Sequence, residues 1–234
     1  QKEREATLDP IKKSALKERL VGYEKAIRAY QEELIAEHPG TFVATIVRMS
    51  MSPEEKEVHK ADGTLDSAGT YYRFRAHFWD NTDLTDERIL RTPVFQNKFD
   101  EYIGKVVPQI PDTINKCADE LIQRMDKNHS DDLWRFAVHN ITYKYETSDI
   151  MGMDAVFVHM AQNYYCPKPG QKSRATWMTD EKLEKLCDRA RKQAPLIIGA
   201  QAKNIILPDT TEQNWVDMYR IPHEYVLVIF WDPH

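Results

Sequence analysis

The sequence predicts a mostly α-helical protein whose last part changes to β-structure. Apolar residues recur at helical spacing in a series of segments up to residue 199. After about residue 200, they gather instead in short runs rich in β-branched side chains. With 234 residues, the chain is long enough to bury a hydrophobic core. We therefore expect a multi-helix domain followed by a few β-strands.

Charge and hydropathy argue against several classes of protein. The formal net charge is −5, from 32 Lys and Arg against 37 Asp and Glu, and the two signs are mixed along the chain. This balance argues against a nucleic-acid binder and against electrostatic binding to an anionic membrane. No apolar run approaches the ~20 residues that cross a bilayer, so we expect no membrane insertion by this chain.

The three cysteines are too few and too widely spaced for a disulfide scaffold, a zinc ribbon or a redox pair. A single bridge between Cys166 and Cys187 is compatible with the sequence. Unpaired buried thiols, with Cys117 as the third, are the simpler interpretation and the one that we expect.

Two helices are predicted at the start of the chain. Residues 12–37 form one long helix, because apolar residues alternate at steps of four and three in a heptad-like seam. This seam, which needs a partner helix in the same chain or in a second copy, is formed by Leu16, Leu20, Tyr23, Ile27, Tyr30 and Leu34. His38-Pro39-Gly40 ends the helix, and Thr41 caps a shorter one.

The middle of the chain alternates loops and helices. Residues 52–69 predict a short helical turn and then a loop. The aromatic cluster that follows favours core packing, with a peptide-binding groove as the alternative: Tyr71, Tyr72, Phe74, Phe78 and Trp79. The pair Tyr164-Tyr165 leaves the same two roles open. Pro93 begins a helix to about Val107, because the N–H that proline lacks is not needed in a first turn.

Four more helices precede the β part, each with a clear start or an apolar stripe. They begin at Pro111, after the cap Ser130, near Asp154 and near Asp180. Strands are then expected at 205–207, 215–219 and 225–231. The continuous run Val226–Trp231 is typical of a strand buried on both faces of a sheet.

We therefore divide the chain into three parts. Residues 1–37 hold the long amphipathic helix and can belong to a preceding domain. Residues 38–199 form the helical domain, and residues 200–234 form the β part.

No constellation predicts catalysis or metal binding. Asp80, Asp83, Asp86 and Glu87 lie near His77, but their spacing does not match a calcium loop, so turn and cap roles are expected. His129, His139 and His159 have no acid–base pattern around them, and His223-Glu224 lacks the second histidine of a zinc-protease motif. We expect no catalytic residue, no metal and no cofactor in this chain.

The last residues carry a resemblance to a known family. Phe230, Trp231, Asp232, Pro233 and His234 resemble the approach to the active site in thioredoxin-like domains of the TlpA/ResA type. There, Phe-Trp-(Ala/Asp)-x-x ends the first central strand and is followed directly by Cys-x-x-Cys. The resemblance implies that residues 200–234 are the first strands of a truncated thioredoxin-like α/β domain. The five residues would flank its dithiol without being catalytic themselves.

The helical part is similar to a domain of unknown function that precedes the thioredoxin-like domain in some bacterial cell-envelope proteins. Six segments carry this likeness: 38–42, 78–86, 91–93, 148–154, 164–165 and 198–205. The resemblance implies the accessory, N-terminal part of a cell-envelope thiol–disulfide oxidoreductase that faces the periplasm. The parent protein would act on a protein thiol or disulfide. The alternative is a non-catalytic protein–protein interaction or oligomerisation module.

A strand without its sheet neighbours exposes unpaired backbone groups at its edges. We therefore expect Val226–Trp231 to be covered by the helical domain, to pair with another copy, or to cause aggregation.

Overall fold

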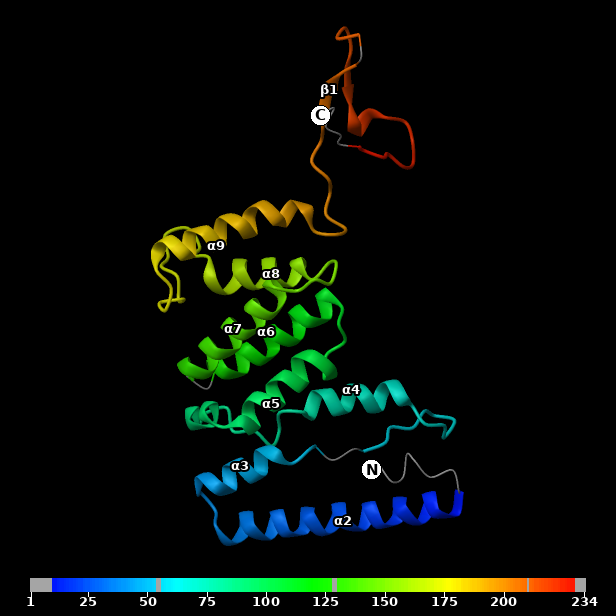
Figure 1. Cartoon of the computed structure of the whole chain (residues 1–234), viewed down its shortest axis with the longest axis vertical. Coiled ribbons are helices and arrows are strands. Elements are labelled where there is room, and N and C mark those ends of the chain that lie inside the picture. The colour runs from blue at the N-terminus through cyan, green and yellow to red at the C-terminus, as the bar shows by residue number, and fades with distance from the viewer. Residues whose placement is uncertain (1–9, 54–55, 128–129, 210, 230–234) are drawn as a thin grey trace. The chain divides into compact units, whose positions relative to one another are not determined.

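The computed structural model describes residues 10–53, 56–127, 130–209 and 211–229, with side chains described from Ser14 onward (Figure 1). Within these residues the chain is mostly helical and forms one two-stranded sheet near its C-terminus, which confirms the predicted fold class. The chain divides into two compact units, residues 1–144 (unit 1) and residues 145–234 (unit 2). The predicted boundaries at 37/38 and 199/200 stay predictions.

Unit 1 begins with two helices that pack on each other, α2 (Pro10–Glu37) and α3 (Phe42–Ser50) (Figure 1). Gly40, at φ +80°, makes the turn between them, in the left-handed conformation that glycine adopts without steric cost. Thr41 is the N-cap of α3, and its Oγ1 accepts a hydrogen bond from the N–H of Ala44 at 3.3 Å. Both predicted helices and the predicted cap are confirmed.

The polar stretch after α3 ends in a helix that the sequence analysis did not contain. An isolated bridge joins His59 and Leu65, and α4 (Ser67–His77) follows. Asp66 caps α4, since its Oδ1 accepts the N–H of Gly69 at 2.9 Å. The aromatic run therefore begins on a helix.

The rest of unit 1 follows the predicted order. The elements are η1 (Glu87–Arg91), α5 (Pro93–Glu101), the π-helical turn η2 (Tyr102–Val106), α6 (Pro111–Lys127) and α7 (Asp131–Glu146), whose last two residues belong to unit 2. Pro93 stands in the first turn of α5, as expected. Most large apolar side chains of α5, η2 and α6 are buried, so these elements supply much of the core of unit 1.

The predicted cap of α7 acts differently. Ser130 precedes the helix, but its Oγ donates to the carbonyl of Leu84 at 2.6 Å. The N–H of Asp132 donates instead to Glu87 Oε1 at 2.9 Å. The Glu87 carboxylate thus accepts a hydrogen bond from a backbone N–H in the first turn of α7, which has no partner within the helix. It also places a negative charge at the positive end of the helix dipole, which is favourable.

Aromatic rings form the centre of the unit 1 core. Trp79 lies between Tyr102 at 5.2 Å and Phe95 at 6.1 Å, measured between ring centroids. Phe136 on α7 contacts Phe95 at 5.6 Å and Phe99 at 5.2 Å. Tilted and edge-on contacts of this kind stabilise aromatic pairs beyond the area that they bury.

Unit 2 is built on two helical elements that pack on each other. The first comprises α8 (Asp154–Met160) and the π-helical turn η3 (Ala161–Tyr165), and the second comprises α9 (Asp180–Gln193) and η4 (Ala194–Leu196). Their interface is formed by Phe157, Val158, Ala161, Leu186, Ala190, Ala194 and Ile197. Arg189 lies over the ring of Phe157, 4.3 Å from its centroid, and pairs with Glu146.

A disulfide joins Cys166 and Cys187, so the expectation of unpaired thiols at these positions is wrong. The packing of η3 against α9 brings the two Cα atoms to 5.6 Å, within the range that a disulfide spans. The two cysteines come together only through tertiary packing, so their spacing along the chain does not predict the bridge.

The arm, as we call the described residues from Gln201 to Ile229, follows α9 and is drawn in orange to red in Figure 1. Strands β1 (Ile206–Pro208) and β2 (Trp215–Asp217) pair antiparallel, with Leu207 opposite Val216. At the turn, Asp209 accepts from Thr211 and Asn214, and these bonds lower the pKa of Asp209 to about 2. The first two predicted strands are thereby confirmed.

The third predicted strand does not form in its described part. Tyr225–Ile229 has no strand partner, and its side chains are 42–84 % exposed. They are therefore not buried on two faces, which contradicts that expectation for these residues. Covering by the helical domain, pairing with another copy and aggregation stay predictions.

Candidate functional site

The acidic residues near His77 each have a structural partner. Asp80 Oδ2 lies 2.6 Å from His77 Nδ1, and Asp83 Oδ1 accepts from both the N–H and the hydroxyl of Thr85. Asp86 binds Arg88 with both carboxylate oxygens. Since Glu87 caps α7, these carboxylates serve turns, caps and ion pairs and do not converge on one point. The turn and cap roles that we expected are confirmed.

The other candidate histidines lie at separate places. His139 is exposed on α7 and stacks on Tyr143, and His159 on α8 contacts the amide of Asn163. His223 belongs to the arm and is exposed, and His129 lies outside the described residues. In the part of the chain that the structure describes, no group of three His, Cys, Asp or Glu side chains is placed to hold a metal ion.

The aromatic cluster is divided between core and surface. Phe78 and Trp79 are only 3 % and 4 % exposed, which confirms core packing for these two residues. Tyr72 is 57 % exposed, and Tyr71 donates its hydroxyl to the carbonyl of Val106. Of the tyrosine pair in unit 2, Tyr165 is buried with its ring against Trp177.

The residues predicted to flank a dithiol, Phe230, Trp231, Asp232, Pro233 and His234, lie outside the described residues. The described residues contain two other candidate sites, the exposed arm and a cleft in unit 1.

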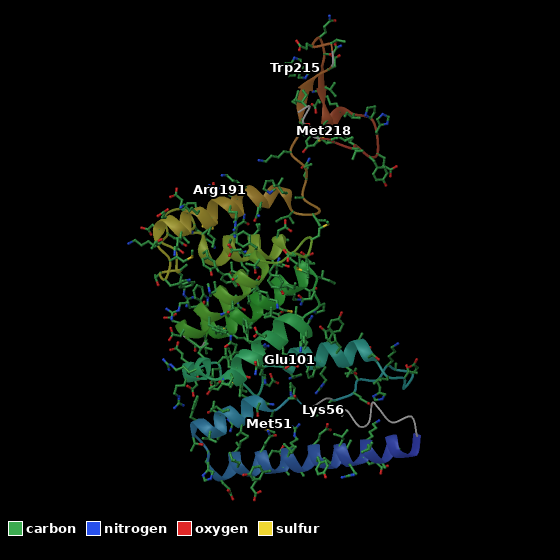
Figure 2. All side chains as sticks on the ribbon, viewed as in Figure 1. Met51, Lys56, Glu101, Arg191, Trp215 and Met218 are labelled. Atoms are coloured by element: carbon green, nitrogen blue, oxygen red, sulfur yellow. A yellow bond between two sulfur atoms is a disulfide. The ribbon has the colours of Figure 1, made fainter. Side chains whose placement is uncertain are left out.

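The cleft has a volume of about 240 Å³ and lies between the end of α3, the segment after it, and α5. Its floor is formed by the buried residues Met49, Pro53, Phe78 and Lys98. Its rim is polar and exposed, with Ser50, Ser52, Asn97 and Glu101. Figure 2 labels two of the lining residues, Met51 and Glu101.

Lys98 is the unusual member of the floor, because lysine is almost never fully buried without a partner. Its Nζ makes two contacts: it donates to the carbonyl of Met49 at 2.9 Å and lies 5.3 Å from the centroid of the Phe78 ring. The second contact is a cation–π interaction. An ammonium has three N–H donors, and within the described residues Met49 O accepts one of them. The remaining donors are available to a ligand in the cleft.

Burial lowers the pKa of Lys98 to about 8, and the nearby charge of Glu101 opposes part of this shift. Since the folded-state pKa lies below the ordinary value, the unfolded chain binds this proton more tightly between the two values. The contribution of Lys98 to the free energy of unfolding therefore rises with pH through that window.

We predict that an NMR titration of the lysine Cε resonances gives a midpoint near pH 8 for Lys98. The ordinary value for a lysine side chain is about 10.4. The difference in the free energy of unfolding between the native chain and Lys98→Met should also rise with pH, between about 8 and about 10.4. A Lys98 midpoint at the ordinary lysine value would contradict the burial argument.

Lys98 is not among the candidate residues predicted from the sequence. The available signal was its place on α5, three residues after Phe95 and four before Tyr102, in the stripe of buried aromatic residues. A charged residue within such a stripe predicts that its side chain is buried. The stripe does not predict the cleft beside Lys98.

The third cysteine is not a redox candidate. Cys117 is free and buried on α6, and burial raises the pKa of its thiol. The thiolate is the reactive form, so this environment makes Cys117 unreactive.

The described residues define a mostly helical protein, with a small cleft that contains a buried ammonium in unit 1 and an exposed β-arm in unit 2. A family model described as a domain of unknown function, DUF5106, matches residues 65–192, more than half of the chain. The chain belongs to this family. No curated protein and no solved structure matches it. The match begins just before α4 and ends in α9, so α2, α3 and the arm lie outside it. Within the described residues, no helix is both long and apolar enough to cross a membrane.

Proposed function

We propose that this chain is the accessory, N-terminal part of a cell-envelope thiol–disulfide oxidoreductase. In this proposal, residues 200–234 supply the first strands of a thioredoxin-like domain of the TlpA/ResA type. The chain itself contributes no redox dithiol. Its role is to hold that domain and to shape what reaches the active site.

The exposed end of the arm carries the proposal. Leu227 and Tyr225 are each 84 % exposed and Ile229 is 70 % exposed, within a run of β-branched and apolar residues. Soluble proteins rarely leave contiguous apolar surface of this kind without a partner. The unpaired backbone of such a run offers edges to sheet neighbours. A thioredoxin-like sheet would supply such neighbours, and the strands that precede this run, β1 and β2, pair with each other.

The disulfide supports the proposed compartment. Disulfides form and persist in oxidising environments, which include the bacterial periplasm, and are rare in the cytosol. The Cys166–Cys187 bridge is therefore compatible with a protein that faces the periplasm.

The proposal is tested by reading the coding sequence downstream of His234 and producing the protein through the domain encoded there. We expect Cys-x-x-Cys followed by a thioredoxin fold, and insulin reduction by this longer protein. Replacing both cysteines of that motif by serine should abolish the activity. A stop codon or an unrelated sequence in that position would overturn the proposal.

The role of the arm has its own test in the longer protein. Leu227→Asp should lower the melting temperature of the redox domain and its insulin reduction, because a charge would enter the sheet. The matched control is Val43→Asp on α3, since Val43 is also apolar and 59 % exposed. Equal effects of the two changes would contradict sheet formation by the arm.

A second candidate is an oligomerisation module that uses the seam on α2. Tyr23, Ile27 and Tyr30 of this seam are 58–65 % exposed. If a second copy covers the seam, the native chain is an oligomer and the double change Leu20→Asp and Ile27→Asp makes it monomeric. Light scattering of both proteins decides this: a monomeric native chain removes the candidate.

A further inference from the structure

We propose that the cleft of unit 1 binds a free apolar α-amino acid, with the ligand carboxylate on Lys98 and the ligand ammonium on Glu101. Neither the family description nor the proposed redox role assigns a ligand to this cleft. The inference rests on its geometry and charges, and it stands whether or not the redox proposal holds.

The floor supplies the site for a carboxylate. Lys98 lines the cleft and is 8 % exposed, and its Nζ contacts Met49 O and the ring of Phe78, two residues that also line the cleft. A buried ammonium with N–H donors left over is best satisfied by an anion that brings its own acceptors. Binding an anion also favours the charged form of Lys98, which burial alone disfavours.

The rim supplies a site for a cation. Glu101 lies three residues after Lys98, at the end of α5, so both side chains leave the same face of the helix. Glu101 and Lys98 are the charged residues among those described around the cleft, and their charges balance. Glu101 would repel a simple anion, whereas a ligand with both charges on neighbouring atoms satisfies both residues.

The walls and the size of the cleft determine which side chain the bound amino acid can have. Met49, Met51 and Val94 present apolar surface, and methionine side chains adapt to irregular shapes. At about 240 Å³, the cleft is smaller than the roughly 300–1,000 Å³ of pockets for drug-sized molecules. An amino acid with an aliphatic or thioether side chain suits this space.

Isothermal titration of the native chain near neutral pH compares L-leucine and L-methionine with three analogues. L-Leucinamide lacks the carboxylate, N-acetyl-L-leucine lacks the ammonium, and hexanoate has an apolar tail and a carboxylate but no cation. We expect the two amino acids to bind at millimolar or lower concentrations and each analogue to bind at least about tenfold more weakly.

Two variants connect the binding to the cleft. Lys98→Met should weaken L-leucine binding at least about tenfold, because it removes the buried charge partner. Glu101→Gln should weaken it about threefold, as expected for an exposed ion pair. The matched controls are Lys105→Met and Asp100→Asn, at exposed charged residues of the same region that do not line the cleft. Both controls should bind like the native chain.

Absence of binding by both amino acids would overturn the proposal. Hexanoate binding as tightly as L-leucine would also overturn it and identify a simple carboxylate site. An unchanged affinity in Glu101→Gln would remove the role of the rim. The comparison of ligands on the native chain decides the matter even if Lys98→Met does not fold.

Discussion

Phe95→Ala is expected to lower the free energy of unfolding of unit 1 by about 3–5 kcal/mol, the usual cost of truncating a buried phenylalanine. Phe95 is fully buried and contacts the rings of Trp79, Phe99 and Phe136. Its loss leaves a cavity that these large rings can fill only in part. Urea denaturation followed by circular dichroism measures the effect.

The matched control is Tyr72→Ala, which also removes an aromatic ring from unit 1. Tyr72 is 57 % exposed and lies beside the guanidinium of Arg75. Its loss should cost less than about 1 kcal/mol. If Phe95→Ala costs no more than Tyr72→Ala, the aromatic core is not packed as described.

Loss of the disulfide is expected to destabilise unit 2 by about 3 kcal/mol. The bridge joins residues 21 positions apart, and closing a loop of this size removes much of the freedom of the unfolded chain. Reduction by dithiothreitol, or the double change Cys166→Ala and Cys187→Ala, should move the urea midpoint of unit 2 downward. Amide exchange in α8 and α9 should rise, while exchange in α6 stays unchanged.

The double variant also controls for the reductant. Its denaturation curve should not move when dithiothreitol is added, because Cys117 is unpaired. An unchanged midpoint of the native chain after reduction would show that the bridge does not stabilise unit 2.

The helices that could be predicted from the sequence are those that combine a one-sided apolar stripe with a local start or stop. Thr41 before α3, Pro93 in α5 and Pro111 in α6 are such starts, and each was located correctly. Helix α4 was missed because none of its residues is buried. Its aromatic residues stand at neighbouring positions, such as Tyr71 and Tyr72, and give no stripe.

Contacts between distant residues could not be predicted. Glu87 caps α7 from 45 positions away, and Lys98 binds Met49 across 49 positions. The pairing of Cys166 with Cys187 depends in the same way on the packing of η3 against α9. In each case the sequence shows a residue of the right chemistry, and the tertiary fold supplies the partner.

The predicted strand at 225–231 shows a second reason why a prediction from the sequence can fail. Its composition favours a buried central strand, and the described residues Tyr225–Ile229 are exposed and unpaired. A strand of this type takes up its structure only when neighbouring strands are present. The composition of the run alone therefore does not make a strand in the described residues.

The most direct test of this account is amide hydrogen exchange at Val226–Ile229 in two proteins. These are the 234-residue chain and a chain extended through the thioredoxin-like domain that we propose follows it. We predict rapid exchange in a monomeric preparation of the first and strong protection in the second, because sheet neighbours would then satisfy the backbone. Rapid exchange in both proteins would contradict the account, as would strong protection in the monomeric 234-residue chain.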